Sequence, residues 1–386
     1  MKFHKIIEML SYIFSEAVVL FFLCYISIGS VIWVAIKILD DDAKPLFESY
    51  EGYLLFKKRN NKKIKTKPGE LELKQKVGTG HFGETYFGFW MPAKYPVAVK
   101  VMNLDVFNEE KVINDDLIKV LKHKHVLQPL AIHQFDKQLK LISPLMPLGN
   151  LLWYMKIHKE NINSKLLLIW CLQIAKGMAD LEVKGIIHRN LKAKSILVQN
   201  PHCVKISGFG LAKMLESGQT QFQDTNDYQM PVEWLALESI ETRTFSHKSD
   251  VWSYAVTVWE LLNFGEKKPF DGLCYSEIKA LLEVEEKLDQ PRICSFELYF
   301  AIAMCWNIEP EERPPFKELV KDLSMMSKNP SKYLIIPNDK QRKIPEHSNE
   351  SELLSFTANS LWENLPKISI DKMFFWRKRP GYNKLD

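Results

Sequence analysis

Apolar and polar positions divide the chain into regions of different character. The first is a run without a charged residue from Ala17 to Ile36. At ~1.5 Å per helical residue this run is about 30 Å long, the thickness of the hydrocarbon core of a bilayer, and it predicts a transmembrane helix. A signal peptide is one alternative, but its apolar region is usually about 7 to 15 residues long. A buried core helix is the other.

From Leu71 onward the pattern changes from strands to helices. A segment rich in Val and Tyr and a glycine-rich turn come first, and stretches with helical apolar spacing continue to Ser327. We therefore predict an α+β fold with its strands before its helices. The predicted parts are a short N-terminal segment (1–16), the transmembrane helix (17–39), a basic juxtamembrane linker (40–70), the α+β domain (71–327) and a C-terminal tail (328–386).

Basic residues predict the orientation of the membrane helix. Few lysines precede it, whereas Lys37, Lys44 and the cluster from Lys57 to Lys67 follow it. The more basic side faces the cytoplasm, so we expect a single-pass protein of the plasma membrane with its large domain in the cytoplasm and no extracellular ligand-binding domain. The basic cluster either contacts anionic membrane lipid or is a solvated linker.

Composition excludes several classes of protein. The chain has 386 residues, 46% of them hydrophobic, which is typical of a folded protein rather than a disordered one. Its net charge of +5 is small for this length, so we expect no nucleic-acid partner. The six cysteines are scattered without a Cys-x-x-Cys motif, which argues against a disulfide framework and a zinc site.

The glycine-rich turn is a candidate nucleotide-binding element. Gly78, Gly80 and Gly83 have the spacing that lets backbone amides approach phosphates. This signal is weak alone, but Val97-Ala98-Val99-Lys100 follows at the distance of the strand that carries the ATP-binding lysine of protein kinases. Thr85 departs from that pattern, because it replaces the Val that would pack on adenine.

A second motif resembles a kinase catalytic loop with altered chemistry. In Ile187–Ser195, Asn190 stands where the motif has the Asp that accepts the substrate proton. Ser195 replaces the Asn that is the second metal ligand. Further along, Gly208 occupies the place of the metal-binding Asp in Asp-Phe-Gly.

Several longer segments resemble the receptor tyrosine kinases of the epidermal growth factor receptor (ErbB) family. The resemblance covers roughly residues 70 to 340 and implies a two-lobed protein-kinase-like fold, with a small β-rich N-lobe and a large α-helical C-lobe. The sequence His-Arg-Asn at Asn190 is similar to that of the kinase-impaired member of this family. The resembling segments are Leu145–Gly149, Gln173–Met178, Trp234–Ile240, Ser249–Tyr254, Val256–Leu262 and Lys332–Ile336.

The resemblance implies that no catalytic set is intact. Lys100 is retained, but the Glu that should pair with it is replaced by Asn114, or by Asp115 after a shift of one residue. Without acidic ligands, productive magnesium binding is not expected. Lys100, the three glycines and the backbone of Met146 could still hold ATP weakly without the metal.

Residues that stabilise the family's fold are present. Glu238 and Arg313 match its buried ion pair, and Asp250 matches the residue that holds the catalytic-loop backbone. Ordinary surface charges are the alternative interpretation. Phe222 stands where the family has a phosphorylatable Tyr, which leaves Tyr228 as the other candidate in this segment.

A late helix is a candidate interface. Phe296, Phe300 and Ala303 share one helical face, in the region through which an ErbB kinase domain activates another. They either contact a receptor tyrosine kinase domain, in a hetero- or homodimer, or face the C-lobe core. In the tail, the aromatic and basic residues of Met373–Pro380 could lie on membrane lipid, pack on the C-lobe or remain flexible.

These patterns favour a membrane-anchored, tyrosine-kinase-like pseudokinase that acts by protein-protein contact and modulates receptor tyrosine kinase signalling. A weak or unconventional ATP-dependent protein tyrosine kinase is the alternative. A non-functional gene product is the third possibility.

Overall fold

A computed structural model describes most of the region after the predicted linker. The described residues are 71–80, 83–91, 95–103, 115–135, 137–146, 148–225 and 230–342. The predicted transmembrane helix, the basic linker and the tail beyond residue 342 lie outside these ranges. Within the described ranges, no helix has the length and apolar character needed to span a bilayer.

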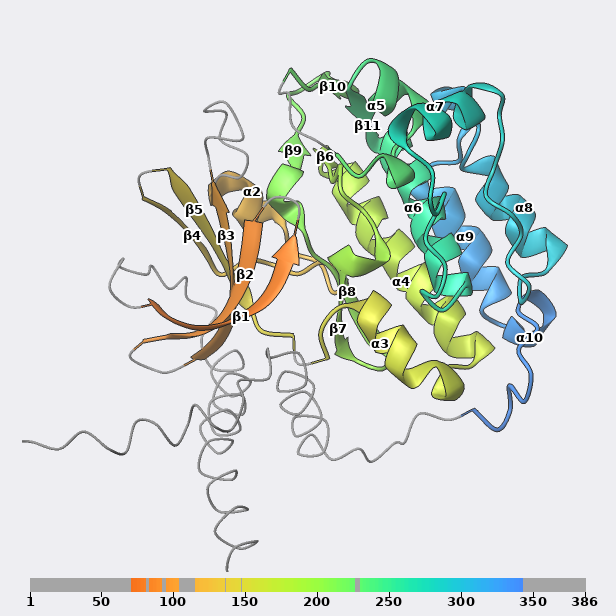
Figure 1. Cartoon of the computed structure of the whole chain (residues 1–386), viewed down its shortest axis with the longest axis horizontal. Helices are drawn as coiled ribbons and strands as arrows, with labels where there is room; N and C mark the ends of the chain where they lie inside the picture. Colours follow the sequence, from red (N-terminus) through yellow and green to blue (C-terminus); the bar gives the residue numbers. More distant parts are fainter. Residues whose placement is uncertain are drawn as a thin grey trace, which may run out of the picture. The chain divides into compact units, whose positions relative to one another are not determined.

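The first part of the described chain is one antiparallel sheet (Figure 1). Its strand order is β1-β2-β3-β5-β4, and each neighbouring pair runs antiparallel. The short helix α2 (Asp115–Val120) contacts β4. The strands are β1 (Leu71–Gly80), β2 (Gly83–Trp90), β3 (Tyr95–Asn103), β4 (Ala131–Phe135) and β5 (Gln138–Pro144).

Alternation in the central strands explains why the sheet folds as it does. Val97 and Val99 lie two residues apart on β3, so their side chains share one face of the sheet. Together with Trp90 and Ile142 they form a small buried cluster. β-Branched side chains suit this pleated surface, and the cluster therefore holds the strand that carries Lys100.

The second part is helical (Figure 1). It contains most of the larger buried cluster. In the described residues its helices are α3 (Leu151–His158), α4 (Ser164–Val183), α5 (Leu237–Glu241), α6 (His247–Leu262), α7 (Tyr275–Glu283), α8 (Phe296–Met304), α9 (Phe316–Met326) and α10 (Pro330–Tyr333). The predicted α+β fold, with a β-rich N-lobe before a helical C-lobe, is confirmed.

Two central helices organise this lobe. α4 contacts α6, α9 and β8 (Cys203–Ile206), and α6 is buried along nearly its whole length. The side chain of Asn163 accepts from the Leu166 amide at 2.9 Å and caps α4. Ser246 and Ser249 form a capping box that starts α6. Both helices therefore begin at residues that satisfy free backbone amides.

Three pairs of short strands position the loops between these helices. They are β6 (Ile186–Ile187) with β9 (Lys213–Met214), β7 (Ile196–Asn200) with β8, and β10 (Gln221–Gln223) with β11 (Thr244–Ser246). The predicted catalytic loop lies between β6 and β7, and Gly208 follows β8. The pairing therefore brings two separate sequence motifs into one region.

Candidate active site

The loop after β6 is held by hydrogen bonds to a carboxylate of α6. The carboxylate of Asp250 accepts from the backbone amides of His188 at 2.7 Å and Arg189 at 2.9 Å. Burial raises the pKa of Asp250 to about 7, and these hydrogen bonds oppose the shift. The prediction that Asp250 holds the loop backbone is confirmed. Glu260, which sequence reasoning missed, accepts from the Ala193 amide at 2.8 Å and from the indole of Trp234 at 2.9 Å.

The three altered catalytic positions come together in space. Gly208 has a left-handed backbone with φ of 86°, a conformation that favours glycine. A Cβ built on Gly208 would lie 3.1 Å from the Ser195 hydroxyl oxygen and 3.9 Å from Asn190 Nδ2. Sequence reasoning from motif spacing therefore identified residues that are true neighbours, and none of the three carries a carboxylate.

Hydrogen bonds engage the hydroxyl at the centre of this group. Ser195 Oγ donates to the Asn190 carbonyl at 2.9 Å. Ser207 donates to the Ser195 carbonyl twice, from its amide at 2.8 Å and its hydroxyl at 2.7 Å. Asn190 Oδ1 is buried and has no hydrogen-bond partner among the described residues. The side-chain oxygens of this group, from Asn190 and Ser195, are thus all uncharged.

Lys100 lies on β3, opposite Thr85 of β2 and Leu141 of β5. Its ammonium nitrogen is 3.2 Å from the position of a Cβ built on Gly210. Burial, together with the nearby charge of Lys192, lowers the pKa of Lys100 to about 8. No carboxylate of the described residues pairs with it. Asn114 and the side chain of Asp115 lie outside the described part, so the alternative partner stays a prediction.

The predicted nucleotide-binding glycines lie at the end of β1 (Gly78 and Gly80) and the start of β2 (Gly83). A Cβ on Gly83 would lie 2.0 Å from the Val101 carbonyl oxygen, so packing inside the sheet alone requires glycine there. Built Cβ atoms on Gly78 and Gly80 have no contact closer than 3.9 and 3.5 Å. A Cβ at these two positions would therefore make only ordinary van der Waals contact, so packing inside the sheet does not require glycine at either.

Two further contacts border this region. Lys194 Nζ, in the catalytic loop, donates to the Thr79 carbonyl at 3.2 Å and connects the loop to the glycine turn. Met146 follows β5, and its carbonyl accepts from the Gly149 amide at 3.2 Å. A nucleotide that used the Met146 carbonyl would therefore share it with this turn.

The segment after Gly208 is anchored through Arg189. Its guanidinium Nη1 lies 2.7 Å from Asp224 Oδ2, and both side chains are almost completely buried. The same guanidinium lies over the rings of Phe222 and Phe245 at 4.8 and 5.4 Å. Lys213 covers Phe222 as well, at 4.7 Å. Phe222, at the position of a phosphorylatable Tyr in the family, thus makes cation–π contacts with Arg189 and Lys213. Tyr228 lies outside the described residues.

A second buried pair links distant parts of the C-lobe. Arg313 donates to both carboxylate oxygens of Glu238, at 2.7 and 2.9 Å, and also to three backbone carbonyls. Its guanidinium lies 5.0 Å from the ring of Trp252. The predicted buried ion pair is confirmed, because Arg313 is fully enclosed.

The candidate interface lies on α8. Phe296 and Phe300 are 69% and 55% exposed, and their rings stack at 6.2 Å. Leu298 and Ile302 form the buried face of the same helix, and Ala303 is half-buried. The alternative that Phe296 and Phe300 face the C-lobe core is therefore wrong.

The two lobes, the loop held by Asp250 and the Glu238–Arg313 pair define the protein-kinase fold. The family model described as "Protein tyrosine and serine/threonine kinase" matches residues 71–323, and the chain belongs to that family.

ErbB receptors are among its relatives. The chain is 43% identical over 286 residues to the human "Receptor tyrosine-protein kinase erbB-4", covering 72% of this chain and 22% of the relative. It is 41% identical over 294 residues to the "Epidermal growth factor receptor" of Apis mellifera, covering 74% of this chain and 22% of the relative. For the Mesocricetus auratus "Receptor tyrosine-protein kinase erbB-2" the identity is 41% over 280 residues, covering 71% and 22%. The chain thus spans about a fifth of the length of these relatives.

Proposed function

We propose that the protein is a membrane-anchored pseudokinase that acts through protein contact and modulates receptor tyrosine kinase signalling. The observation that carries this proposal is the convergence of Asn190, Ser195 and Gly208 without a carboxylate among them. The ErbB relatives support a receptor tyrosine kinase context, since their names describe receptor tyrosine kinases.

The donor set does not fit magnesium. Mg²⁺ in kinase sites is held by carboxylate and amide oxygens together with the phosphates. Here Gly208 has no side chain, and Ser195 offers only an uncharged hydroxyl, which donates its hydrogen to the Asn190 carbonyl. Asn190 Oδ1 alone is a neutral, single oxygen. Loss of a general base costs about 10² to 10⁴ in rate, and loss of the metal removes the charge that stabilises the transferring phosphoryl group.

Weak nucleotide binding is compatible with this proposal. Gly80 is exposed and Gly78 half-buried, and Lys100 and Lys192 together place positive charge in the cleft region. ATP bound there would meet lysine charges in place of a metal ion. Binding would therefore need no divalent cation.

The exposed face of α8 supports a contact function. Large apolar side chains on a surface are typical of protein interfaces, and Phe296 and Phe300 form such a pair beside Ala303. We propose an ErbB-type kinase domain as the partner, in a hetero- or homodimer. Residues 17–39 would anchor the chain in the plasma membrane, with the basic linker near the lipid of the cytoplasmic face.

Two measurements on the purified full chain test the proposal. Thermal unfolding with ATP, with and without Mg²⁺ or Mn²⁺, is expected to give the same midpoint with and without metal. Labelled phosphate is expected not to pass from ATP to a tyrosyl peptide. Transfer that disappears in Lys100→Met would instead establish the alternative, a weak ATP-dependent tyrosine kinase, and refute the pseudokinase proposal.

A further inference from the structure

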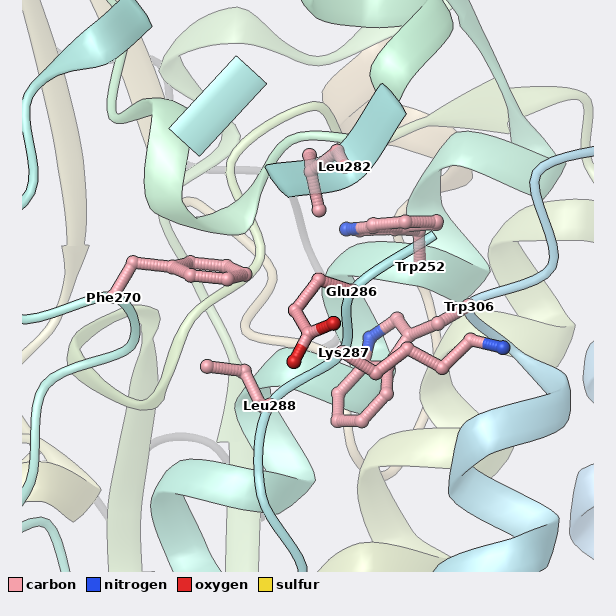
Figure 2. A pocket seen from close by; sticks show the side chains of 7 residues that line it. All are labelled: Trp252, Phe270, Leu282, Glu286, Lys287, Leu288 and Trp306. Carbon is pink, nitrogen blue, oxygen red and sulfur yellow. The ribbon is translucent and has the colours of Figure 1, made fainter. Parts of the chain in front are cut away.

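A small cavity lies in the C-lobe between Trp252 of α6 and Trp306, which follows α8 (Figure 2). Phe270, Leu282 and Leu288 supply the apolar part of its wall. The space open to a water-sized sphere is about 10 Å³, enough for one water molecule and no larger ligand. This cavity therefore carries no ligand site, in contrast to the surface contact that forms where the chain leaves the C-lobe.

Two different contacts hold the chain after the last helix, α10. The first contact is buried. Leu334 and Ile336 both point into the C-lobe core, and the amide of Ile335 between them donates to the Ile293 carbonyl at 2.8 Å. Apolar burial and a backbone hydrogen bond therefore fix the chain as far as Ile336.

The second contact is polar and involves residues 338–342, which we call the strap. The Asp339 carboxylate accepts from the amide and from the hydroxyl of Ser164, both at 2.6 Å. Ser164 is the first residue of α4. Asp339 therefore satisfies an amide that the helix leaves free at its start, and its charge suits the positive end of the helix dipole.

Arg342 forms the other half of the strap. Its Nη1 donates to the Lys159 carbonyl at 2.8 Å, and its own carbonyl accepts from Asn163 Nδ2 at 3.0 Å. The strap thus crosses the junction between α3 and α4. No residue of the strap is buried, and a segment held by exposed hydrogen bonds opens more readily than one held by buried apolar side chains.

Ser331, an exposed residue of α10, lies beside the strap carboxylate. Its hydroxyl donates to Asp339 Oδ2 at 3.3 Å, the same oxygen that accepts from the Ser164 hydroxyl. The three groups that donate to this carboxylate are all uncharged. A negative charge on Ser331 would therefore replace one of these hydrogen bonds with repulsion.

The residues around Ser331 suit recognition by another protein kinase. Lys328 stands three positions before it and Lys332 one position after it, and both lysines are exposed. Charge patterns of this kind are what kinases use to select their substrates. A serine/threonine kinase with an acidic peptide-binding groove is therefore complementary to this segment.

We propose that Ser331 is a phosphorylation site and that its phosphate releases the strap. A serine/threonine kinase that prefers basic substrates transfers the γ-phosphoryl group of ATP. A bond forms between Ser331 Oγ and the γ-phosphorus, the bond from this phosphorus to the β–γ bridging oxygen breaks, ADP leaves, and the hydroxyl proton passes to a base of that kinase. The phosphate carries a charge of about −1.5 to −2 at pH 7 and repels Asp339.

Release of the strap lengthens the free tail. The last fixed residue changes from Arg342 to Ile336, so residues 337–342 become free as well. At about 3.3 to 3.6 Å per extended residue they add roughly 20 Å to the reach of the tail. Phosphorylation of Ser331 thereby controls which surfaces the tail can contact.

Hydrogen exchange measured by mass spectrometry tests the release. The full chain is prepared with genetically encoded phosphoserine at position 331. Amide exchange in the strap is expected to become about tenfold faster, the loss of one or two hydrogen bonds, while exchange around Leu334 and Ile336 stays unchanged. Phosphoserine at Ser276, an exposed residue of α7, is the matched control and should leave the strap as it is.

Salt separates repulsion from crowding. The ratio of exchange rates with and without the phosphate should fall between 0.1 and 1 M NaCl, as the Debye length shortens from about 10 to 3 Å. A ratio that does not depend on salt would contradict electrostatic release. Unchanged or slower exchange in the strap, as expected if the phosphate instead pairs with Arg342, overturns the proposal.

Transfer to the site is tested with labelled ATP and a serine/threonine kinase domain that prefers basic substrates. The peptide that contains Ser331 is expected to take up phosphate in the folded full chain, and Ser331→Ala should abolish this uptake. Lys328→Ala should slow it several-fold. A folded chain that takes up no phosphate at Ser331 would exclude this residue as the modification site.

Discussion

Arg189 and Asp224 form an ion pair of 2.7 Å in which neither side chain reaches solvent appreciably. It joins the catalytic loop to the segment that follows Gly208, beside the ring of Phe222. Phosphorylation of a tyrosine is a common way to supply negative charge to an arginine in such a segment. Here Asp224 provides this charge permanently, so the segment is anchored without modification.

Asp224→Ala is expected to lower the free energy of unfolding by about 3 to 5 kcal/mol, because it removes the carboxylate that is ion-paired with the buried guanidinium of Arg189. Chemical denaturation measures the change. Glu266→Ala is the matched control, since it removes an exposed ion pair with Lys159 and should cost about 0 to 1 kcal/mol. Equal effects of the two substitutions would contradict the structural role of Asp224.

Lys100 is expected to make stability depend on pH. Its pKa falls from 10.5 to about 8 on folding, so between these values the unfolded chain binds more protons than the folded one. The contribution of Lys100 to the free energy of unfolding therefore rises with pH through this window, by up to roughly 3 kcal/mol at about 1.4 kcal/mol per unit. The difference between the wild type and Lys100→Met isolates this contribution from the buried thiols and phenols that titrate in the same range. Below pH 8 the buried charge is fully destabilising.

Lys100→Met should remove this dependence and stabilise the protein at pH 7, as judged by denaturation at several pH values. The exposed Lys165 of α4 supplies the control, and Lys165→Met should leave the profile unchanged. If Lys100→Met destabilises the protein at pH 7, an acidic partner holds the lysine in its charged form.

Gly208→Ala is expected to lower the free energy of unfolding by more than about 2 kcal/mol, because a left-handed conformation alone costs a residue with a Cβ about 1 to 2 kcal/mol. The added atom would also crowd the Ser195 hydroxyl at 3.1 Å. The exposed Gly218, with φ of 85° and no atom within 4 Å of its built Cβ, separates the two effects. Gly218→Ala carries the backbone cost alone, so a smaller loss is expected there, again by denaturation.

Restoring the matched residues at all three positions tests the chemistry. In Asn190→Asp/Ser195→Asn/Gly208→Asp, ATP is expected to raise the thermal midpoint more with Mg²⁺ than without it. The wild type should lack this difference. Metal dependence already present in the wild type would mean that another acid holds the metal.

Phe296→Arg/Phe300→Arg is expected to abolish co-precipitation with an ErbB-type kinase domain, because it places charge at the centre of an apolar contact. Both residues are exposed, so stability should change by no more than about 0.5 kcal/mol. Val183, at the end of α4, is 88% exposed and offers Val183→Arg as the control. Association that survives the double substitution would refute the proposed α8 interface.

Motif spacing predicted much of the site because the chemistry of each motif position depends on the residue type that stands there. Lys100, Asn190, Ser195 and Gly208 were identified from sequence, and the structure places the last three together. Asp224 was missed, although it stands two residues after Phe222, because no local pattern shows that a carboxylate will meet an arginine 35 positions away.

The sequence by itself determined the family, the α+β order of strands and helices, and the absence of carboxylates at positions 190, 195 and 208, since each follows from residue types and their spacing. Tertiary structure decided which groups meet and which remain exposed. Helical periodicity places Phe296 and Phe300 on one face, but only the packing of Leu298 and Ile302 into the core decides that this face is uncovered within the described domain. Burial and pairing are properties of contacts between distant segments, and the folded chain alone specifies them.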